Sequence, residues 1–124
     1  MKAIKDLLDK KTNITHAAYT TTQTGTAIDL ANYAGNAIFI DPLTLTDGTF
    51  TPKLQDSPDN STWTDVATTS IVGTLAVLAS NTQQKVGYIG AQRYVRVVVT
   101  VTGSPATGCV FGSSTILNGK RKLP

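Results

Sequence analysis

The chain has 124 residues, a length that suits one domain with its own core and leaves little room for a second. Its single cysteine, Cys109, excludes an intramolecular disulfide, and no stretch approaches the roughly 20 apolar residues of a membrane span. The net charge of +3 is uneven, because residues 1–11 and 120–124 carry seven Lys/Arg against two Asp, whereas residues 12–119 carry four against six. Basic ends on a weakly acidic body indicate contact with an acidic surface, with solvated tails as the alternative.

The first predicted element is a basic N-terminal arm over residues 1–13. Within it, residues 2–10 predict one short helix, because Ile4, Leu7 and Leu8 fall at i, i+3 and i+4 and share one face. A helix of about nine residues is not stable alone in water. We therefore expect its apolar face to dock on a surface, either of this chain or of a partner.

Beyond the arm, the composition favours strands. Threonine occurs 21 times and glutamate is absent, and many Thr and Val without Glu are typical of sheets rather than helices. The first predicted strands cover residues 14–22, 26–33 and 36–41. We expect the third of them to end at Pro42.

A hairpin is predicted within residues 43–57, because Asp47-Gly48 is a strong turn signal with alternating apolar and polar residues on both sides. Pro52 lies in its second arm and predicts an edge strand or a bulge, since proline has no N–H to give to a ladder. The residues predicted to face inward are Leu43, Leu45, Phe50 and Leu54.

The second half of the chain continues as short strands. A polar loop over residues 57–66 leads into a short strand, and residues 69–80 predict either a strand with a bulge at Gly73 or a short helix. Further strands are predicted over residues 83–90, 93–103 and 108–117. About eight short strands predict an all-β fold, an antiparallel β-sandwich of jelly-roll-like type over residues 14–117, with a basic C-terminal tail over 118–124.

Residues 93–103 form the clearest predicted strand. One face would carry Val95, Val97, Val99 and Val101. The other face would carry Tyr94, Arg96, Val98, Thr100 and Thr102. Arg93 has the parity of the valines, so it must lie beyond the edge of the core or pair with an aspartate. We interpret both arginines as supports for loops, through Asp56 or Asp65, with an inter-subunit contact by Arg96 as the alternative.

Little in the sequence indicates catalysis. His16 is the only histidine and lies far along the chain from Cys109, which its apolar neighbours mark as a small buried hydrophobe. One His and one Cys cannot make a zinc site, and no phosphate-binding glycine motif is present. We expect no enzymatic activity, no cofactor and no small-molecule substrate.

Binding of metal or nucleic acid is also not favoured. Asp56, Asp59, Asn60 and Asp65 cluster around one loop and could offer oxygen ligands to calcium. The stretch Ser-Pro-Asp-Asn-Ser is better explained as turn chemistry, so we expect no metal. A body with few aromatic residues and a slightly acidic charge makes nucleic acid an improbable partner.

Two resemblances meet in these segments. "LQDSPDNSTWTDV" followed by "RYVRVVV" resembles the discoidin or galactose-binding jelly roll, with Asn60 at the position of that family's glycine. The order "KLQDSPDNSTWTDV", "GYIGAQRYVRVVVTVTG", a small-residue strand and a basic tail is similar to small structural proteins of tailed phages. This second resemblance runs over about residues 33–124.

The phage resemblance implies a virion component, most specifically a capsid decoration (cement) protein that binds the major capsid protein and other copies of itself. A trimer on the capsid surface is the expected assembly, made in the host cytoplasm. The contact residues would be Ile4, Leu7, Leu8, Lys10, Lys11, Arg96, Lys120, Arg121 and Lys122. The alternatives are a head–tail connector or tail component, and a carbohydrate-binding module that uses exposed rings of Trp63, Tyr88 or Tyr94.

Overall fold

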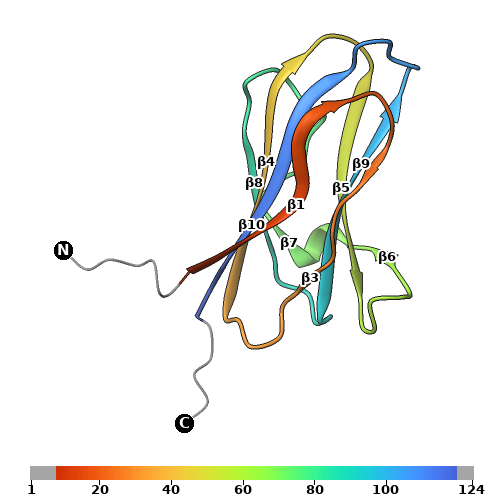
Figure 1. Ribbon diagram of the computed structural model, residues 1–124. Coiled ribbons are helices and arrows are strands. Elements are labelled where there is room, and N and C mark those ends of the chain that lie inside the picture. Colours follow the sequence, from red (N-terminus) through yellow and green to blue (C-terminus); the bar gives the residue numbers. More distant parts are fainter. Residues whose placement is uncertain (1–7, 120–124) are drawn as a thin grey trace, which may run out of the picture.

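The computed structural model describes residues 8–119, which form ten strands and one 3-10 turn, η1 (Thr68–Ser70) (Figure 1). The longer strands are β1 (Leu8–Tyr19), β4 (Gly35–Leu45), β5 (Thr49–Ser57), β8 (Gln84–Tyr88), β9 (Tyr94–Thr102) and β10 (Cys109–Asn118). The two-residue strands are β2 (Gln23–Thr24), β3 (Ile28–Asp29), β6 (Thr64–Asp65) and β7 (Ile71–Val72). Within residues 8–119, no helix is long and apolar enough to cross a membrane.

The strands pair antiparallel in two sheets that pack face to face (Figure 1). The first sheet has the order β1-β10-β4-β8-β7; the second has the order β2-β9-β5-β6, with β3 also paired to β9. With β2 and β3 taken as one interrupted strand and β7 as an edge addition, this is the strand order of a jelly roll. The predicted antiparallel β-sandwich is confirmed.

The core lies between the sheets, and β9 contributes to it as its alternation predicts. Val95, Val97 and Val99 are at most 1% exposed, and each fully buried valine stabilises the fold by roughly 1.5–3 kcal/mol. Phe111 of β10 meets Phe50 of β5 edge to face, with ring centroids 5.8 Å apart. This aromatic pair joins the first sheet to the second.

The prediction of a hairpin around Asp47-Gly48 is wrong. The strands on its two sides, β4 and β5, belong to different sheets, so this turn carries the chain across the sandwich. The carboxylate of Asp47 accepts hydrogen bonds from the backbone N–H groups of Ala106, Thr107 and Gly108, which lie between β9 and β10. Asp47 therefore links the connection between β4 and β5 to the connection between β9 and β10, and it does not close a hairpin.

These three N–H donors lower the pKa of Asp47 below its usual value of 3.8, with the bond from Gly108 the largest cause. A carboxylate with a lowered folded-state pKa stabilises the fold above its unfolded pKa, and this contribution is lost as the pH falls through the folded value. We expect Asp47→Asn to be less stable than the wild type at pH 7, by urea denaturation. The gap should shrink at about pH 3; a gap that does not change with pH would contradict this role.

Three local predictions are also corrected. Leu8 to Lys10 lie in strand β1, not in the predicted helix, whose other residues, 2–7, are outside the described range. Strand β4 does not end at Pro42 but continues to Leu45. Pro42 pairs with Phe111 of β10, next to a register shift, and the pairing of β4 with β8 stops at Ile40. The missing N–H of Pro42 therefore leaves no gap in the pairing with β8. Leu43 is 49% exposed instead of inward-facing.

Other predictions for this region hold. Leu45 is half-buried against the core, and Phe50 and Leu54 are at most 1% exposed. Pro52 lies on a stretch of β5 that pairs only with β9, because β6 pairs with β5 only at Gln55 and Asp56. That stretch is an edge, as a proline in a strand predicts.

Candidate functional site

The two ends of the described chain lie side by side at one end of the sandwich (Figure 1). Strand β1 starts where β10 finishes, and Leu8 is the pairing partner of Asn118. The side chains of Lys10 and Lys11 follow on β1, and both are exposed. We call this region, Leu8–Lys11 with Leu117–Gly119, the paired end.

The two lysines of the paired end point to different sides of the first sheet. Lys10 pairs with Ile116, whose side chain alternates with the buried Thr115 and Leu117 and so lies on the outer face. Lys11 pairs with Thr115 on the inner side and lines a hollow of about 440 Å³ beside Ile28 and Asp29. The paired end therefore presents positive charge on both sides of β1.

A second hollow opens on the other side of the segment that joins β3 to β4. It measures about 850 Å³ and lies among the ends of β4 and β8 and the short strand β7. Tyr33 borders both hollows, and its hydroxyl donates a hydrogen bond to Asp9, which raises the pKa of Tyr33. Two large apolar side chains at the larger hollow, Val72 and Ile89, are 57% and 64% exposed.

Nothing in the sequence alone pointed to these hollows. They depend on how β3, β7 and the chain between β3 and β4 close over the sheet ends, and these elements are too short to leave a periodic signal. The only available cue is the pair of apolar residues, Val72 and Ile89, in turn-rich stretches. In the folded chain both remain on the surface.

Arg93 has a structural role. Its Nε and Nη2 donate hydrogen bonds of 2.9 and 2.8 Å to the two carboxylate oxygens of Asp29. This bidentate bond lowers the pKa of the Asp29 carboxyl. The predicted pairing with an aspartate is confirmed, although the partner is Asp29 of β3 and not Asp56 or Asp65.

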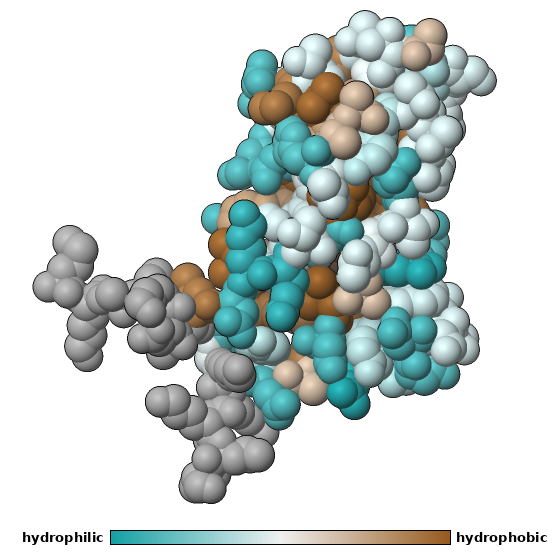
Figure 2. Space-filling view, viewed as in Figure 1, coloured by the Kyte–Doolittle hydropathy of each residue, from teal (hydrophilic) through white to brown (hydrophobic). Residues whose placement is uncertain are grey.

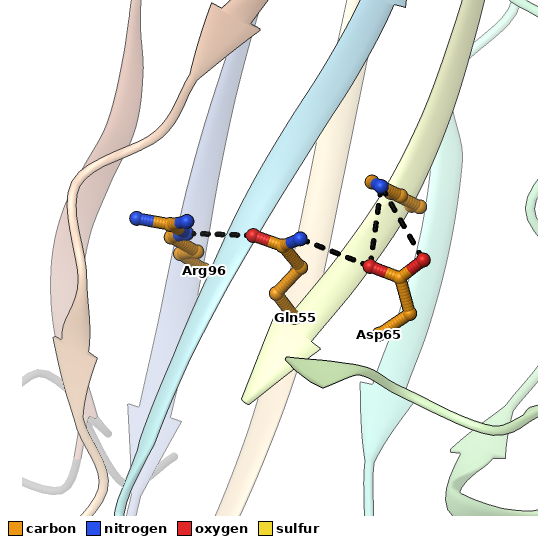
Figure 3. Close-up of polar contacts among 4 residues, drawn as sticks. Gln55, Asp65 and Arg96 are labelled. Carbon is orange, nitrogen blue, oxygen red and sulfur yellow. Dashed lines mark hydrogen bonds and ion pairs between the residues drawn. The ribbon is translucent and has the colours of Figure 1, made fainter. Parts of the chain in front are cut away.

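Arg96 lies on the other sheet, in a row of polar side chains across β9, β5 and β6 (Figure 3). Its Nε donates a 2.9 Å hydrogen bond to the side-chain oxygen of Gln55. The amide nitrogen of Gln55 donates a 2.9 Å hydrogen bond to Asp65, which also pairs with Lys53 at 3.1 Å. The guanidinium carbon is 4.2 Å from the centroid of the Trp63 ring. Arg96 therefore bonds to neither Asp56 nor Asp65 directly, and it is connected to Asp65 only through Gln55.

The predicted contact residues do not form one cluster. Leu8, Lys10 and Lys11 lie together on β1, whereas Arg96 lies on β9 of the opposite sheet. Five of the predicted contact residues fall outside the described range. They are Ile4, Leu7, Lys120, Arg121 and Lys122.

Of the three rings expected for a carbohydrate site, Tyr88 is buried, whereas Trp63 and Tyr94 are partly exposed. Tyr88 is 4% exposed and donates a 2.7 Å hydrogen bond to Asp56, and burial with this bond raises its pKa to about 12. The guanidinium carbon of Arg96 lies over the Trp63 ring at 4.2 Å from its centroid, and that of Arg93 lies 5.1 Å from the centre of the Tyr94 ring. Sugars need an open aromatic face to stack on, so the burial of Tyr88 counts against a carbohydrate site at that ring.

The aspartate loop is occupied by internal hydrogen bonds. Asp59 accepts from the backbone N–H groups of Ser61 and Thr62, and Asn60 adopts a positive φ of 62°, a conformation that asparagine tolerates. Across residues 8–119, no group of three His, Cys or Asp side chains is arranged to hold a metal ion. The turn interpretation of this loop accounts for its geometry.

The contacts of His16 and Cys109 fit a role in holding the fold together. His16 bonds through Nε2 to the backbone oxygen of Asp41, 3.1 Å away, and its ring lies beside Gly112. Cys109 is 1% exposed, and burial raises the pKa of its thiol. The thiolate needed for nucleophilic chemistry is therefore disfavoured.

The surface of the sandwich carries no single broad apolar patch on the face that includes β1 and β3. Figure 2 shows hydrophilic residues over most of that face, with hydrophobic residues reaching the surface in separate places. Such scattered exposure is usual for soluble folds. Polar side chains, more than apolar area, make up this face.

Comparison with known proteins gives distant structural likenesses only. No protein-family model matches the chain, and no curated protein matches it. The SPBc2 prophage-derived protein YomS is 16% identical, covers 94% of this chain and 98% of its own length, and superposes with a TM-score of 0.49. PirA is also 16% identical, with 95% and 98% covered and a TM-score of 0.45. At these values, function must be inferred from the chain's own residues.

Proposed function

We propose that this chain is a tailed-phage virion structural protein, and specifically a capsid decoration protein that binds the head shell. The pairing of Leu8 with Asn118 carries the proposal. This pairing brings together the two points from which residues 1–7 and 120–124 continue, and these residues belong to the two segments richest in Lys and Arg, 1–11 and 120–124. The resemblance of residues 33–124 to small phage structural proteins supports the same role.

The paired end suits an acidic shell surface, and the expected partner is the major capsid protein. A single exposed ion pair contributes only about 0.2–1 kcal/mol, so several cations must act together. Seven Lys/Arg in the two terminal segments provide that number. A stable contact would bury on the order of 1,200–2,000 Å² in total, and copies arranged as a trimer would multiply the attachment points.

Charge reversal at the paired end tests the proposal. We expect Lys10→Glu/Lys11→Glu to bind purified head shells of the encoding phage or prophage about tenfold more weakly than the wild type, because two attractions become repulsions. The measurement is co-sedimentation with the shells over a range of protein concentrations. Binding should also weaken between about 0.05 and 0.5 M salt, since exposed charges are screened.

Lys85→Glu provides the matched control, because Lys85 is an exposed lysine of the same sheet, on β8. It should bind nearly as well as the wild type. A wild-type protein that does not bind shells would refute decoration, whereas shell binding unaffected by the Lys10/Lys11 change would refute the paired end as the anchor. Antibody labelling of intact particles separates decoration of the shell from a position in the neck or tail.

A further inference from the structure

The guanidinium of Arg96 is held in a fixed orientation by groups on two sides. Gln55 accepts from Nε, and the guanidinium carbon lies over the Trp63 ring, 4.2 Å from its centroid. Gln55 is itself fixed by Asp65, and Asp65 by Lys53 (Figure 3). A long side chain normally loses rotamer freedom when it binds a partner, and this network has already restricted Arg96 in the free protein.

The terminal nitrogens of the same guanidinium remain available. Among residues 8–119, neither Nη1 nor Nη2 of Arg96 has a hydrogen-bond acceptor, and one of them points away from Gln55 (Figure 3). The acid in the same row, Asp65, is engaged by Gln55 and Lys53, whose hydrogen bonds lower its pKa. The charge of Arg96 therefore has no ion-pair partner within the described residues.

A planar guanidinium with free terminal N–H groups has the geometry to bind a carboxylate or a phosphate through two parallel hydrogen bonds. The surroundings favour a single carboxylate over a nucleic acid. Residues 8–119 carry six Lys/Arg against seven Asp, so the sandwich has no excess of positive charge around Arg96 with which to hold a polyanion. The Trp63 face against Arg96 is covered, and nucleic-acid bases need open aromatic faces to stack on.

We infer that Arg96 is a preorganised receptor for an aspartate or glutamate side chain of a partner protein, at the centre of a second contact surface on the outer face of the β2-β9-β5-β6 sheet. Trp63 and Gln55 are its positioning residues. This surface lies on the sheet opposite to the paired end. The inference holds whether or not the partner is a capsid protein.

Titration of the isotope-labelled protein with N-acetyl-aspartate amide, followed by NMR, tests this inference. The Arg96 Nε–Hε and Trp63 indole N–H signals should shift in a saturable way, and the shifts should be absent with sodium chloride at equal ionic strength. Arg96→Lys keeps the charge but loses the planar fork, so it should bind the probe about tenfold more weakly. Equal binding by Arg96→Lys would overturn the inference.

Two further measurements identify the class of ligand and test the role of Gln55. Inorganic phosphate should bind more weakly than the carboxylate probe; tighter binding of phosphate would overturn the choice of a carboxylate. Gln55→Ala should weaken binding while leaving the charge of Arg96 intact, because the guanidinium loses one of its two supports. Unchanged affinity in Gln55→Ala would show that Arg96 is not preorganised, and a thermal unfolding curve for each variant confirms that it is folded.

Discussion

Replacing Phe111 with alanine is expected to lower the free energy of unfolding by about 3–5 kcal/mol, the usual cost of removing a buried phenylalanine ring. The Phe111 side chain is fully buried. Its ring packs against Tyr19 of β1 at a centroid distance of 5.1 Å and against Phe50 of β5 at 5.8 Å. The substitution leaves a cavity and removes an aromatic contact between the sheets. For a chain of this size, the midpoint of thermal unfolding should fall by about 10–20 °C.

Phe39→Ala is the matched control for this experiment. Phe39 lies on β4 of the same sheet, but it alternates with the buried Ile38 and Ile40 and is only half-buried, on the outer face. The same chemical change there should cost about 1 kcal/mol. If the two variants lose similar stability in urea denaturation, Phe111 does not hold the sheets together in the way its contacts indicate.

The second large effect is expected at Gly108, immediately before β10. Its φ of +79° is a conformation that residues with a side chain rarely adopt, and a Cβ there would clash with the backbone oxygen of Tyr19. Its N–H and carbonyl also bond to Asp47 and to the N–H of Thr46. Gly108→Ala must therefore move the backbone and strain these bonds. We expect a loss of at least about 2–3 kcal/mol in the free energy of unfolding.

Gly103→Ala separates the two causes of that loss. Gly103 also has a positive φ, +86°, but a Cβ there would only reach ordinary contact with Gly48, at 3.6 Å. This control carries the cost of the backbone conformation alone, about 1–2 kcal/mol. Both variants are measured by the same urea denaturation. If Gly108→Ala and Gly103→Ala lose the same free energy of unfolding, the clash with Tyr19 costs nothing beyond the backbone conformation.

Much of the fold was predictable because it depends on local alternation. Val95, Val97 and Val99 recur at every second position of 93–103 and are buried in β9 as predicted, although Val98 between them is buried as well. Phe50 and Leu54 follow the same rule in β5. The same reasoning failed for residues 8–10, where three apolar residues near the start of the chain gave a helical spacing but pairing with β10 selected a strand. Pairing between distant segments overrides a weak local preference.

The candidate surfaces were predictable only in part. Lys10, Lys11 and Arg96 were recognisable as exposed or partner-facing cations by their positions in the sequence. Their neighbours were not, because Gln55 and Trp63 reach Arg96 from segments about 30 to 40 residues away along the chain. A guanidinium becomes a preorganised receptor only when such groups surround it in the folded chain. The periodicity of the sequence cannot predict which distant residues come together in this way.

By itself, then, the sequence determined the all-β class, the buried faces of β5 and β9 and the concentration of positive charge in its two terminal segments. Tertiary structure decided that Asp47-Gly48 crosses between sheets, because β4 and β5 find their hydrogen-bond partners in different sheets. It also decided that Leu8 and Asn118 are neighbours, which brings the attachment points of both basic segments together. The physical reason is the same in each case: alternation fixes which side of a strand is buried, whereas the strand's partner is fixed by backbone pairing between residues far apart in the chain.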